Sequence, residues 1–250
     1  MPFAARGCPV GCSFCVVPQL EGTTFTLDWE FQPAPILGDN NLSALPSAFQ
    51  EHIIARYQAT GCRRADANRG FEPRPFDEGT YQRRHPILRG PWSFAYDEAR
   101  EGAAGARVCR ILAGEVPKRK RVYVLLGNEP LESCWDRVLS VLAWGGEPFC
   151  QYVLPLNWLG DPVTLRPRFE WSYGLGRDLC RYVNTFGWRT FPPSAYQPRH
   201  GSPPPLAGTA LASPAWDARW ATALADNRTF HHRLPAPPAT HGATQPRLFS

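Results

Sequence analysis

The chain has no long hydrophobic run and very little lysine. No apolar stretch approaches the roughly 20 residues that span a bilayer, so we expect no membrane partner. The opening residues, MPFAARGCPVGC, lack the basic and the uninterrupted apolar segments of a secretory signal peptide. We therefore predict a cytoplasmic protein, in which thiols stay reduced. Basic charge is almost all arginine, since Lys118 and Lys120 are the only lysines, and we interpret this as a composition bias.

The composition is that of a globular protein. A chain of 250 residues can form one large domain with a hydrophobic core, or one domain and an appendage. Hydrophobic residues make up 43%, and there are nine tryptophans. The formal net charge of +5 mildly favours a polyanionic partner, although an arginine-rich solvated surface explains it better. The sequence contains no internal repeat that we can detect.

Short strand-like runs alternate with helical patterns along most of the chain. We expect strands at residues 3–6, 34–37, 63–67, 92–96, 121–126 and 149–154. Helical spacing of apolar residues predicts helices at residues 46–60, 77–85, 98–112 and 131–142. Strands that alternate with helices predict an α/β fold with a parallel sheet, arranged as a barrel or as an open twisted sheet.

The character of the sequence changes near residue 191. The stretches FPPSAYQPRHGSPPPLAG and LPAPPATHGATQ are proline-rich and cannot continue a helix or a central strand. One short amphipathic helix is expected between them, at residues 216–227. We predict a domain over residues 1–190 and an extended or disordered tail over residues 191–250.

Three cysteines stand close together in RGCPVGCSFC, with the spacing C-x3-C-x2-C. Thiolates are natural ligands of soft metals and iron–sulfur clusters, and three of them can hold three corners of a four-iron cluster. Gly7 and Gly11 would let the loop curl around it. Two alternatives remain. Zinc would need a fourth ligand from Cys62, Cys109 or a distant histidine, and inert buried cysteines would be unusually dense. We favour the cluster.

The cysteine loop resembles the signature of the radical S-adenosylmethionine (radical SAM) superfamily, C-x3-C-x-aromatic-C. Cys8, Cys12 and Cys15 match its three cluster ligands, and Phe14 matches its aromatic position. Together with LEG, GDNN, RVYVLLGNEPLE and QYVLPLNWL, the loop is similar to compact bacterial and phage-type members of that superfamily. The resemblance covers residues 1 to about 190. Because only seven residues precede Cys8, we expect no cobalamin-binding domain from this chain.

The resemblance implies a fold and a reaction. The fold would be a partial (β/α)6 barrel with the site at the carboxyl ends of its strands. A 4Fe-4S cluster would bind S-adenosylmethionine and cleave it reductively to a 5′-deoxyadenosyl radical, which abstracts hydrogen from an unknown substrate. An external electron donor of the flavodoxin or ferredoxin type would be a partner. Family habit and the mild positive charge suggest a nucleotide or nucleic-acid substrate.

The resemblance also assigns residues to S-adenosylmethionine. Gly38, Asp39 and Asn40 stand in the place of the glycine-glycine-glutamate motif that holds the methionine amino group, with Asp39 or an asparagine as the substitute for the missing glutamate. Leu126 and Gly127 stand where the fifth strand packs on the adenine. Backbone atoms around Tyr152 and Leu154 match the sixth-strand adenine contact.

Polar residues follow the predicted strands, where they would meet at the mouth of a barrel or simply form turns and helix caps. They are Asp39 to Asn41, Asp66 with Asn68 and Arg69, Asp97 with Glu98, Asn128 with Glu129, and Asn157. Arg69 is the evident anion-binding candidate. The remaining cysteines, Cys62, Cys109, Cys134, Cys150 and Cys180, show no second cluster spacing, and we interpret them as core residues.

Two other functions are compatible with the same loop. The chain could be a non-catalytic zinc- or iron–sulfur-binding protein whose basic surface, including PKRKRV, contacts nucleic acid. It could also be a degenerate barrel that binds a cluster without turning over. Of the three, we predict the radical SAM enzyme.

Overall fold

The structure is a computed structural model that describes residues 2–12, 14–62, 66–67, 70–153, 169, 172–197 and 204–232. Its α-helices are α1 Val17–Glu21, α2 Ser47–Thr60, α3 Glu78–Arg84, α4 Gly102–Ile111, α5 Leu131–Ala143, α6 Tyr173–Asn184 and α7 Pro214–His232. Its strands are β1 Ala5–Arg6, β2 Thr26–Leu27, β3 Ile36–Leu37, β4 Asp66–Ala67, β5 Trp92–Tyr96, β6 Lys120–Leu126 and β7 Glu147–Tyr152. The predicted mixture of helices and parallel strands is confirmed.

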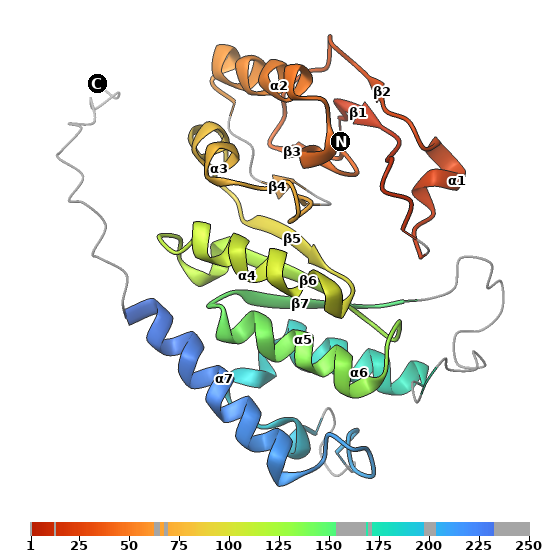
Figure 1. Cartoon of the computed structure of the whole chain (residues 1–250), viewed down its shortest axis with the longest axis vertical. Coiled ribbons are helices and arrows are strands. Elements are labelled where there is room, and N and C mark those ends of the chain that lie inside the picture. Colours follow the sequence, from red (N-terminus) through yellow and green to blue (C-terminus); the bar gives the residue numbers. More distant parts are fainter. Residues whose placement is uncertain are drawn as a thin grey trace, which may run out of the picture.

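The centre of the molecule is a three-stranded parallel sheet in the order β5-β6-β7. Trp92 of β5 pairs with Lys120 of β6, and Leu126 at the end of β6 pairs with Tyr152 of β7. The helices α4 and α5 connect these strands in sequence, as parallel strands require (Figure 1). The carboxyl ends of the three strands therefore lie at one edge of the sheet.

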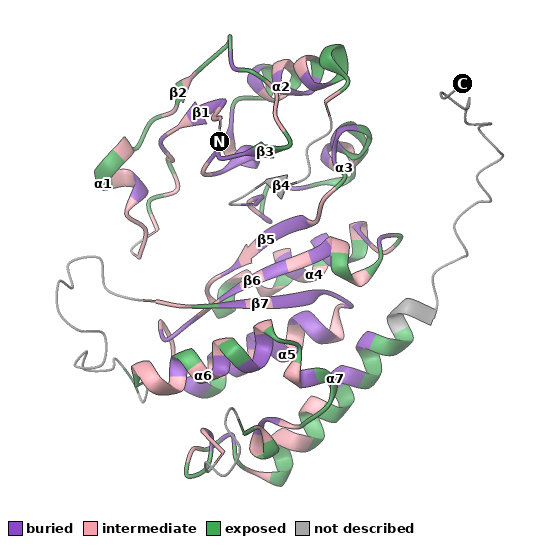
Figure 2. Cartoon of the chain, turned by 180° about the vertical axis from the view of Figure 1, so that it is seen from behind, coloured by how far each residue is buried: buried purple, intermediate pink, exposed green. Residues whose placement is uncertain are grey.

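Strand β6 has two different faces, because successive side chains of a strand point to opposite sides. Val122, Val124 and Leu126 are buried in a core that they share with α5, α6 and α7. Tyr123 and Leu125 are less buried and point to the other face. Figure 2 shows this burial along the central strands. The face opposite α5 is thus the one left for a binding site.

A second core is formed by the amino-terminal part of the chain together with strand β5. Phe49, Ile53 and Tyr57 on one face of α2 belong to it, together with Trp92 and Phe94 of β5. The predicted helix over residues 46–60 is confirmed as α2, and it ends at Gly61 with the positive φ of 66° that favours glycine there.

The predicted six-stranded partial barrel is not formed by the described residues. Their strands make three separate sheets of two, two and three strands, and none closes. Strands β1 to β4 have two residues each, too few for a continuous ladder, and β1 pairs antiparallel with β2, which the sequence did not predict. The parallel pair β3–β4 is followed by a bridge from Phe71 to Phe94, which joins this part to β5.

Within the predicted tail, the described residues 204–232 contain a helix that packs on the rest of the chain. Leu206 and Leu211 are buried, and α7 runs beyond both ends of the helix expected at residues 216–227 (Figure 1). Leu224 of α7 packs into the core that α5 shares with the sheet. The prolines in the flanking stretches argued against a helix or a central strand there. The local sequence could not show that the helix between these stretches packs against α5.

Helix α7 is fastened to α5 by a buried amide. Asn227 is 6% exposed, and its Nδ2 donates to the carbonyl oxygens of Leu142 at 2.9 Å and Gly146 at 3.1 Å. Leu142 lies in the last turn of α5, where its carbonyl also accepts from the Gly145 N–H at 2.9 Å, and Gly146 follows the helix.

Asn227→Ala is therefore expected to lower the free energy of unfolding by about 1–3 kcal/mol, because two buried hydrogen bonds are lost, although the Leu142 carbonyl keeps the Gly145 N–H as a donor. Urea unfolding measures the change. The exposed neighbour Arg228 supplies a control, Arg228→Ala, which should stay within about 0.5 kcal/mol of wild type. Equal stability of the two variants would show that this contact does not hold α7.

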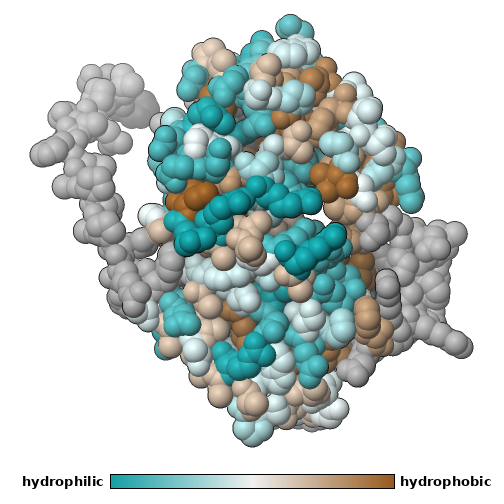
Figure 3. Space-filling view, in the orientation of Figure 1, coloured by the Kyte–Doolittle hydropathy of each residue, from teal (hydrophilic) through white to brown (hydrophobic). Residues whose placement is uncertain are grey.

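The surface is mostly polar on the face seen in Figure 3, where hydrophobic colour occurs in small separate patches. Within the described part of the chain, no helix is both long enough and apolar enough to cross a membrane.

Candidate metal centre and pocket

A pocket of about 860 Å³ lies at the carboxyl edge of the central sheet. Its walls combine the cysteine loop with the ends of the three parallel strands and the turns near them. They include Cys8, Cys12, Phe14, Cys15, Asn40, Asn41, Phe71, Glu72, Ala95, Asp97, Tyr123, Leu125, Cys150, Gln151, Tyr152, Val153 and Cys180. The three predicted metal ligands therefore share one pocket with Phe14, Asn40 and Tyr152.

The cysteine loop has the curled backbone that its glycines predict. Gly7 and Gly11 have φ values of 85° and 65°. A side chain at Gly7 would also collide with the carbonyl oxygen of Thr24. All three cysteines are half-buried thiols outside any disulfide. The loop thus presents thiols to the pocket on a backbone that only glycine adopts easily.

Glu21 braces the base of this loop. Its carboxylate accepts hydrogen bonds from the Gly7 N–H at 3.1 Å and from Asn40 Nδ2 at 2.5 Å, and it forms an ion pair with Arg6. Asn40 also donates to the Gly7 carbonyl at 3.4 Å. The family resemblance includes Glu21 in the segment LEG but assigns it no role, and the short helix α1 that carries it has no periodic pattern.

Asp39 and Gly38 hold strands together and do not line the pocket. Asp39 is 2% exposed, and its carboxylate accepts from the backbone N–H groups of Ala4, at 3.0 Å, and Ala5. The Gly38 N–H donates to the Pro2 carbonyl at 2.9 Å. This part of the chain faces the pocket through Asn40 and Asn41 instead.

Leu126 and Gly127 are also outside the lining. Leu126 is 1% exposed and belongs to the core on the α5 side of β6. The strand alternation places Tyr123 and Leu125 in the pocket instead, and the period of two along β6 could have identified them.

Gly127 supports the pocket from behind. A Cβ at Gly127 would lie 2.6 Å from Cε2 of Tyr152, and a Cβ at Gly176 of α6 would also collide with that ring. The two glycines therefore let the Tyr152 ring sit between β6 and α6 while it lines the pocket. Leu154, the other residue assigned to the adenine contact, lies outside the described residues.

The remaining predicted polar residues divide into three groups. Asn41 lines the pocket and caps the turn at Ala44, and Asp97 lines the pocket as well. Asn128 and Glu129 are not in the lining but belong to a network behind it. Asn68, Arg69, Asn157 and the Asp66 side chain lie outside what the structure describes.

Two cysteines interpreted as core residues also reach the pocket. Cys150 and Cys180 both line it, whereas Cys62, Cys109 and Cys134 do not. Burial raises the pKa of Cys180 to about 12 and that of Cys150 well above its ordinary value. Both are therefore neutral thiols at physiological pH.

The pocket disfavours negative charge on its thiols. Burial raises the pKa of Cys12 to about 11, and the nearby Asp97, Cys15 and Cys8 add to the effect. A bound metal reverses this, because a coordinating thiol is deprotonated. Among the described residues, no three His, Cys, Asp or Glu side chains converge closely enough for one metal ion. The donor set itself, three thiols on one pocket wall, fits an iron–sulfur cluster chemically.

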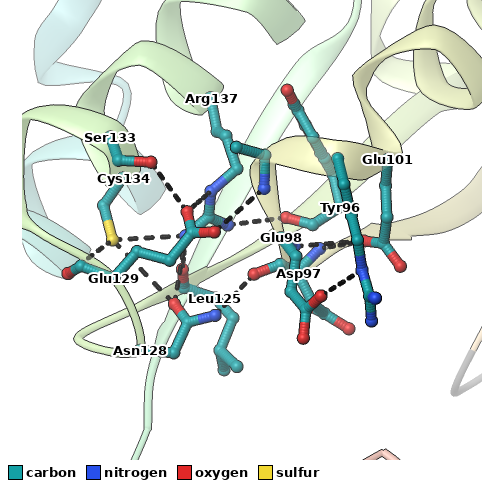
Figure 4. Close-up of polar contacts among 12 residues, drawn as sticks. Tyr96, Asp97, Glu98, Glu101, Leu125, Asn128, Glu129, Ser133, Cys134 and Arg137 are labelled. Atoms are coloured by element: carbon teal, nitrogen blue, oxygen red, sulfur yellow. Dashed lines mark hydrogen bonds and ion pairs between the residues drawn. The ribbon is translucent and has the colours of Figure 1, made fainter.

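Arg137 of α5 organises the turns that follow β5 and β6 (Figure 4). Its side chain is 1% exposed. It donates to the carbonyl oxygens of Tyr96 at 2.8 Å and Leu125 at 2.7 Å, and to Asn128 Oδ1 at 3.0 Å. Its Nε lies 3.1 Å from Glu129 Oε2. One buried guanidinium therefore ties two strand ends at the pocket to the helix behind them.

Asp97 stands where this network meets the pocket. Its backbone is held, since its N–H donates to Glu101 Oε2 at 2.7 Å and its carbonyl accepts from Asn128 Nδ2 at 2.6 Å. Burial and then the negative charge of Glu101 raise the pKa of the Asp97 carboxyl to about 7, against the opposing effect of Arg137.

The raised pKa predicts a pH-dependent stability. The ordinary pKa of Asp is 3.8, so the folded chain binds this proton more tightly than the unfolded chain, and the stability it contributes is lost as pH rises through about 7. Asp97→Asn, which stays neutral, is expected to be more stable than wild type at pH 8 by about 1–3 kcal/mol, since a tenfold change in proton affinity is worth about 1.4 kcal/mol and solvent screens part of it.

Urea unfolding of both proteins at pH 5 and pH 8 measures this difference. The gap at pH 5 should be roughly two-fifths of the gap at pH 8, because the pKa-linked loss of stability begins near pH 3.8, where the unfolded chain ionises, and is complete only above about pH 7. A gap that does not change with pH would contradict the assignment.

Comparison with known proteins gave one distant likeness in structure. No family model matches the chain, and no curated protein matches it. A solved structure of the radical S-adenosylmethionine methyltransferase TsrM from Kitasatospora setae, with cobalamin and a [4Fe-4S] cluster bound, superposes with a TM-score of 0.45 and 16% identity. The match covers all of this chain and 55% of that one, so the chain spans about half the length of that protein. A likeness of this degree assigns no function.

Proposed function

We propose that the chain is a radical SAM enzyme. The observation that supports this proposal is the shared pocket: Cys8, Cys12 and Cys15, in the spacing C-x3-C-x-aromatic-C, line one cavity at the carboxyl ends of parallel strands. Ligand sites of α/β sheets lie at that edge. The proposal includes a partial barrel, an external electron donor of the flavodoxin or ferredoxin type, and a reducing compartment such as the cytoplasm.

Different residues of the pocket would bind two different cofactors. Cys8, Cys12 and Cys15 would hold a 4Fe-4S cluster through three thiolates. When bound, the cluster would supply the electron that cleaves S-adenosylmethionine to methionine and a 5′-deoxyadenosyl radical, which takes hydrogen from the substrate. Asn40 and Asn41, which line the pocket where Asp39 does not, would meet the amino-acid part of S-adenosylmethionine.

The aromatic walls would receive the adenosyl group. Phe14 and Tyr152 line the pocket, and Tyr152 is held between Gly127 and Gly176. Flat rings of this kind stack on bases and exclude water. We also propose that these aromatic walls exclude water from the reacting atoms.

One preparation tests the proposal. The chain is purified without oxygen, reconstituted with iron and sulfide, and its absorption spectrum recorded. Dithionite and S-adenosylmethionine are then added and 5′-deoxyadenosine is quantified. We expect a brown protein that releases 5′-deoxyadenosine.

Three other results would contradict the proposal in different ways. A colourless protein that retains zinc would support the zinc-binding alternative. A brown protein that never releases 5′-deoxyadenosine would indicate a degenerate member that binds a cluster without turnover. A protein that takes up no metal would leave the cysteines without the proposed role.

A further inference from the structure

The charge of the pocket is opposite to that of the chain. The sequence carries a formal net charge of +5, yet among the described residues that line the pocket the charged ones are Glu72 and Asp97, and none is Arg, Lys or His. A phosphate group would therefore meet carboxylates there and no described cation. The pocket favours a positively charged ligand.

Only one of the two carboxylates lacks a compensating cation among the described residues. Glu72 forms a two-point ion pair with Arg74, with Nε to Oε1 at 2.6 Å and Nη2 to Oε2 at 3.1 Å. No hydrogen bond or ion pair from described residues reaches the Asp97 carboxylate. Arg137 is committed to Glu129 and to backbone carbonyls. Asp97 is thus the pocket charge left to a ligand.

If the proposed function holds, its two cofactors together would not supply the positive charge that Asp97 lacks. A 4Fe-4S core with two positive charges on three thiolates has one net negative charge, and S-adenosylmethionine has one net positive charge. The two cancel, which leaves the negative charge of Asp97 for the molecule that shares the pocket with them. The pocket volume of about 860 Å³ lies near the upper end of the roughly 300–1,000 Å³ that small-molecule sites measure.

The walls beside Asp97 indicate what else the ligand carries. Tyr123 and Leu125 line the pocket on β6, the strand next to β5, which Asp97 follows, and Tyr152 lines it on β7. An apolar or aromatic group fits these walls, and a cation beside aromatic faces gains further stabilisation.

We propose that the substrate of this pocket is an amine that is protonated at neutral pH, with its ammonium group paired with the Asp97 carboxylate and an apolar portion against Tyr123 and Tyr152. This differs from the nucleotide or nucleic acid suggested by family habit and net charge, because the described lining offers a phosphate no partner.

Three probes of the same shape test the ligand class: benzylamine, benzyl alcohol and benzoate, which are positive, neutral and negative. Their affinities are measured by calorimetry on reconstituted protein with S-adenosylmethionine bound, and on cluster-free protein. We expect benzylamine to bind at least about tenfold more tightly than benzyl alcohol, and benzoate to bind most weakly, since one close charge pair is worth 1.4 kcal/mol or more. Asp97→Asn should remove the preference. The exposed Glu132 gives a control with the same charge change, Glu132→Gln, which should keep it.

The affinity for benzylamine should also depend on pH. The charged groups that affect Asp97 are Glu98 and Glu101 of its own turn, Glu72 after Phe71, Arg137 of α5 and the Cys12 thiol of the cysteine loop. With a pKa of about 7, the carboxyl is mostly protonated at pH 6 and mostly ionised at pH 8. In cluster-free protein, binding of benzylamine, which stays protonated over this range, should strengthen about tenfold between these pH values in wild type and not in Asp97→Asn.

Several outcomes would overturn the inference. Equal affinities of benzylamine and benzyl alcohol would do so, and so would a preference for benzylamine that survives in Asp97→Asn. A preference present in cluster-free protein but abolished by S-adenosylmethionine would mean that the cofactor itself pairs with Asp97. Failure to assemble a cluster would refute the proposed function alone, because the probes then still test Asp97 in cluster-free protein, where loss of the amine preference would refute the inference.

Discussion

Cys12→Ala is expected to lose the iron–sulfur chromophore and to release no 5′-deoxyadenosine. Cys12 is a half-buried thiol on the wall of the pocket that Cys8 and Cys15, the other proposed ligands, also line. With two thiolates left, a cuboidal cluster would lose one of its three anchors. Iron and sulfide analysis with the absorption spectrum measures the loss.

A matched variant separates ligand loss from the general effect of removing a thiol. Cys62 is also half-buried and outside any disulfide, but it follows α2 and does not line the pocket. Cys62→Ala should therefore reconstitute like wild type. A Cys12→Ala protein that keeps its iron and its cleavage activity would show that the ligand assignment is wrong.

Arg137→Met is expected to lower the free energy of unfolding by about 3–5 kcal/mol, because several hydrogen bonds from one buried guanidinium are lost together. The buried guanidinium satisfies the carbonyls of Tyr96 and Leu125, the side chain of Asn128 and the carboxylate of Glu129 at once. Met fills similar volume but donates nothing, so the Tyr96 and Leu125 carbonyls and Asn128 lose this donor, whereas Glu129 keeps Ser133 and the Ala99 N–H as donors. Denaturant unfolding at constant pH measures the change.

Arg137→Lys and Arg83→Met serve as controls for this prediction. Lysine keeps the charge but cannot form the planar fork, so its loss should be intermediate. Arg83 and its partner Glu51 are both about half exposed, with Arg83 Nε 3.1 Å from Glu51 Oε1, so removal of Arg83 should cost about 1 kcal/mol or less. A loss below about 1 kcal/mol in Arg137→Met would mean that the network does not stabilise the fold.

Local patterns predicted the central units of the fold. The apolar run at residues 121–126 and the helical spacing after it predicted β6 and α5, and both are present with shifts of about one residue at their ends. The helix at residues 46–60 and its end at Gly61 also followed from spacing and glycine. Such elements are set by neighbours in the sequence, which is why one sequence suffices for them.

Contacts between distant residues were not predictable in the same way. Asp39 turns toward the backbone of Ala4 and Ala5 because β1 needs partners for its amides, and nothing near Asp39 in the sequence indicates this. The packing of α7 depends on Asn227 meeting the end of α5, residues that are far apart in the chain.

The candidate site shows the same division between local and distant information. The spacing of Cys8, Cys12 and Cys15 predicted thiols that the structure brings to one pocket. The family resemblance pointed to Leu126, but Leu125 lines the pocket because successive side chains of a strand point to opposite faces. This alternation can be predicted from the sequence once the strand is known. Glu21 and Arg137 act through contacts that only the folded chain brings together.

The vacant iron corner that the three thiols would leave for S-adenosylmethionine can be observed directly. The electron paramagnetic resonance spectrum of the reconstituted, dithionite-reduced protein is recorded with and without S-adenosylmethionine. The proposed function predicts a cluster signal whose shape and position change when S-adenosylmethionine is added, and no change with S-adenosylmethionine in Cys12→Ala. A cluster signal that is identical with and without S-adenosylmethionine would contradict it.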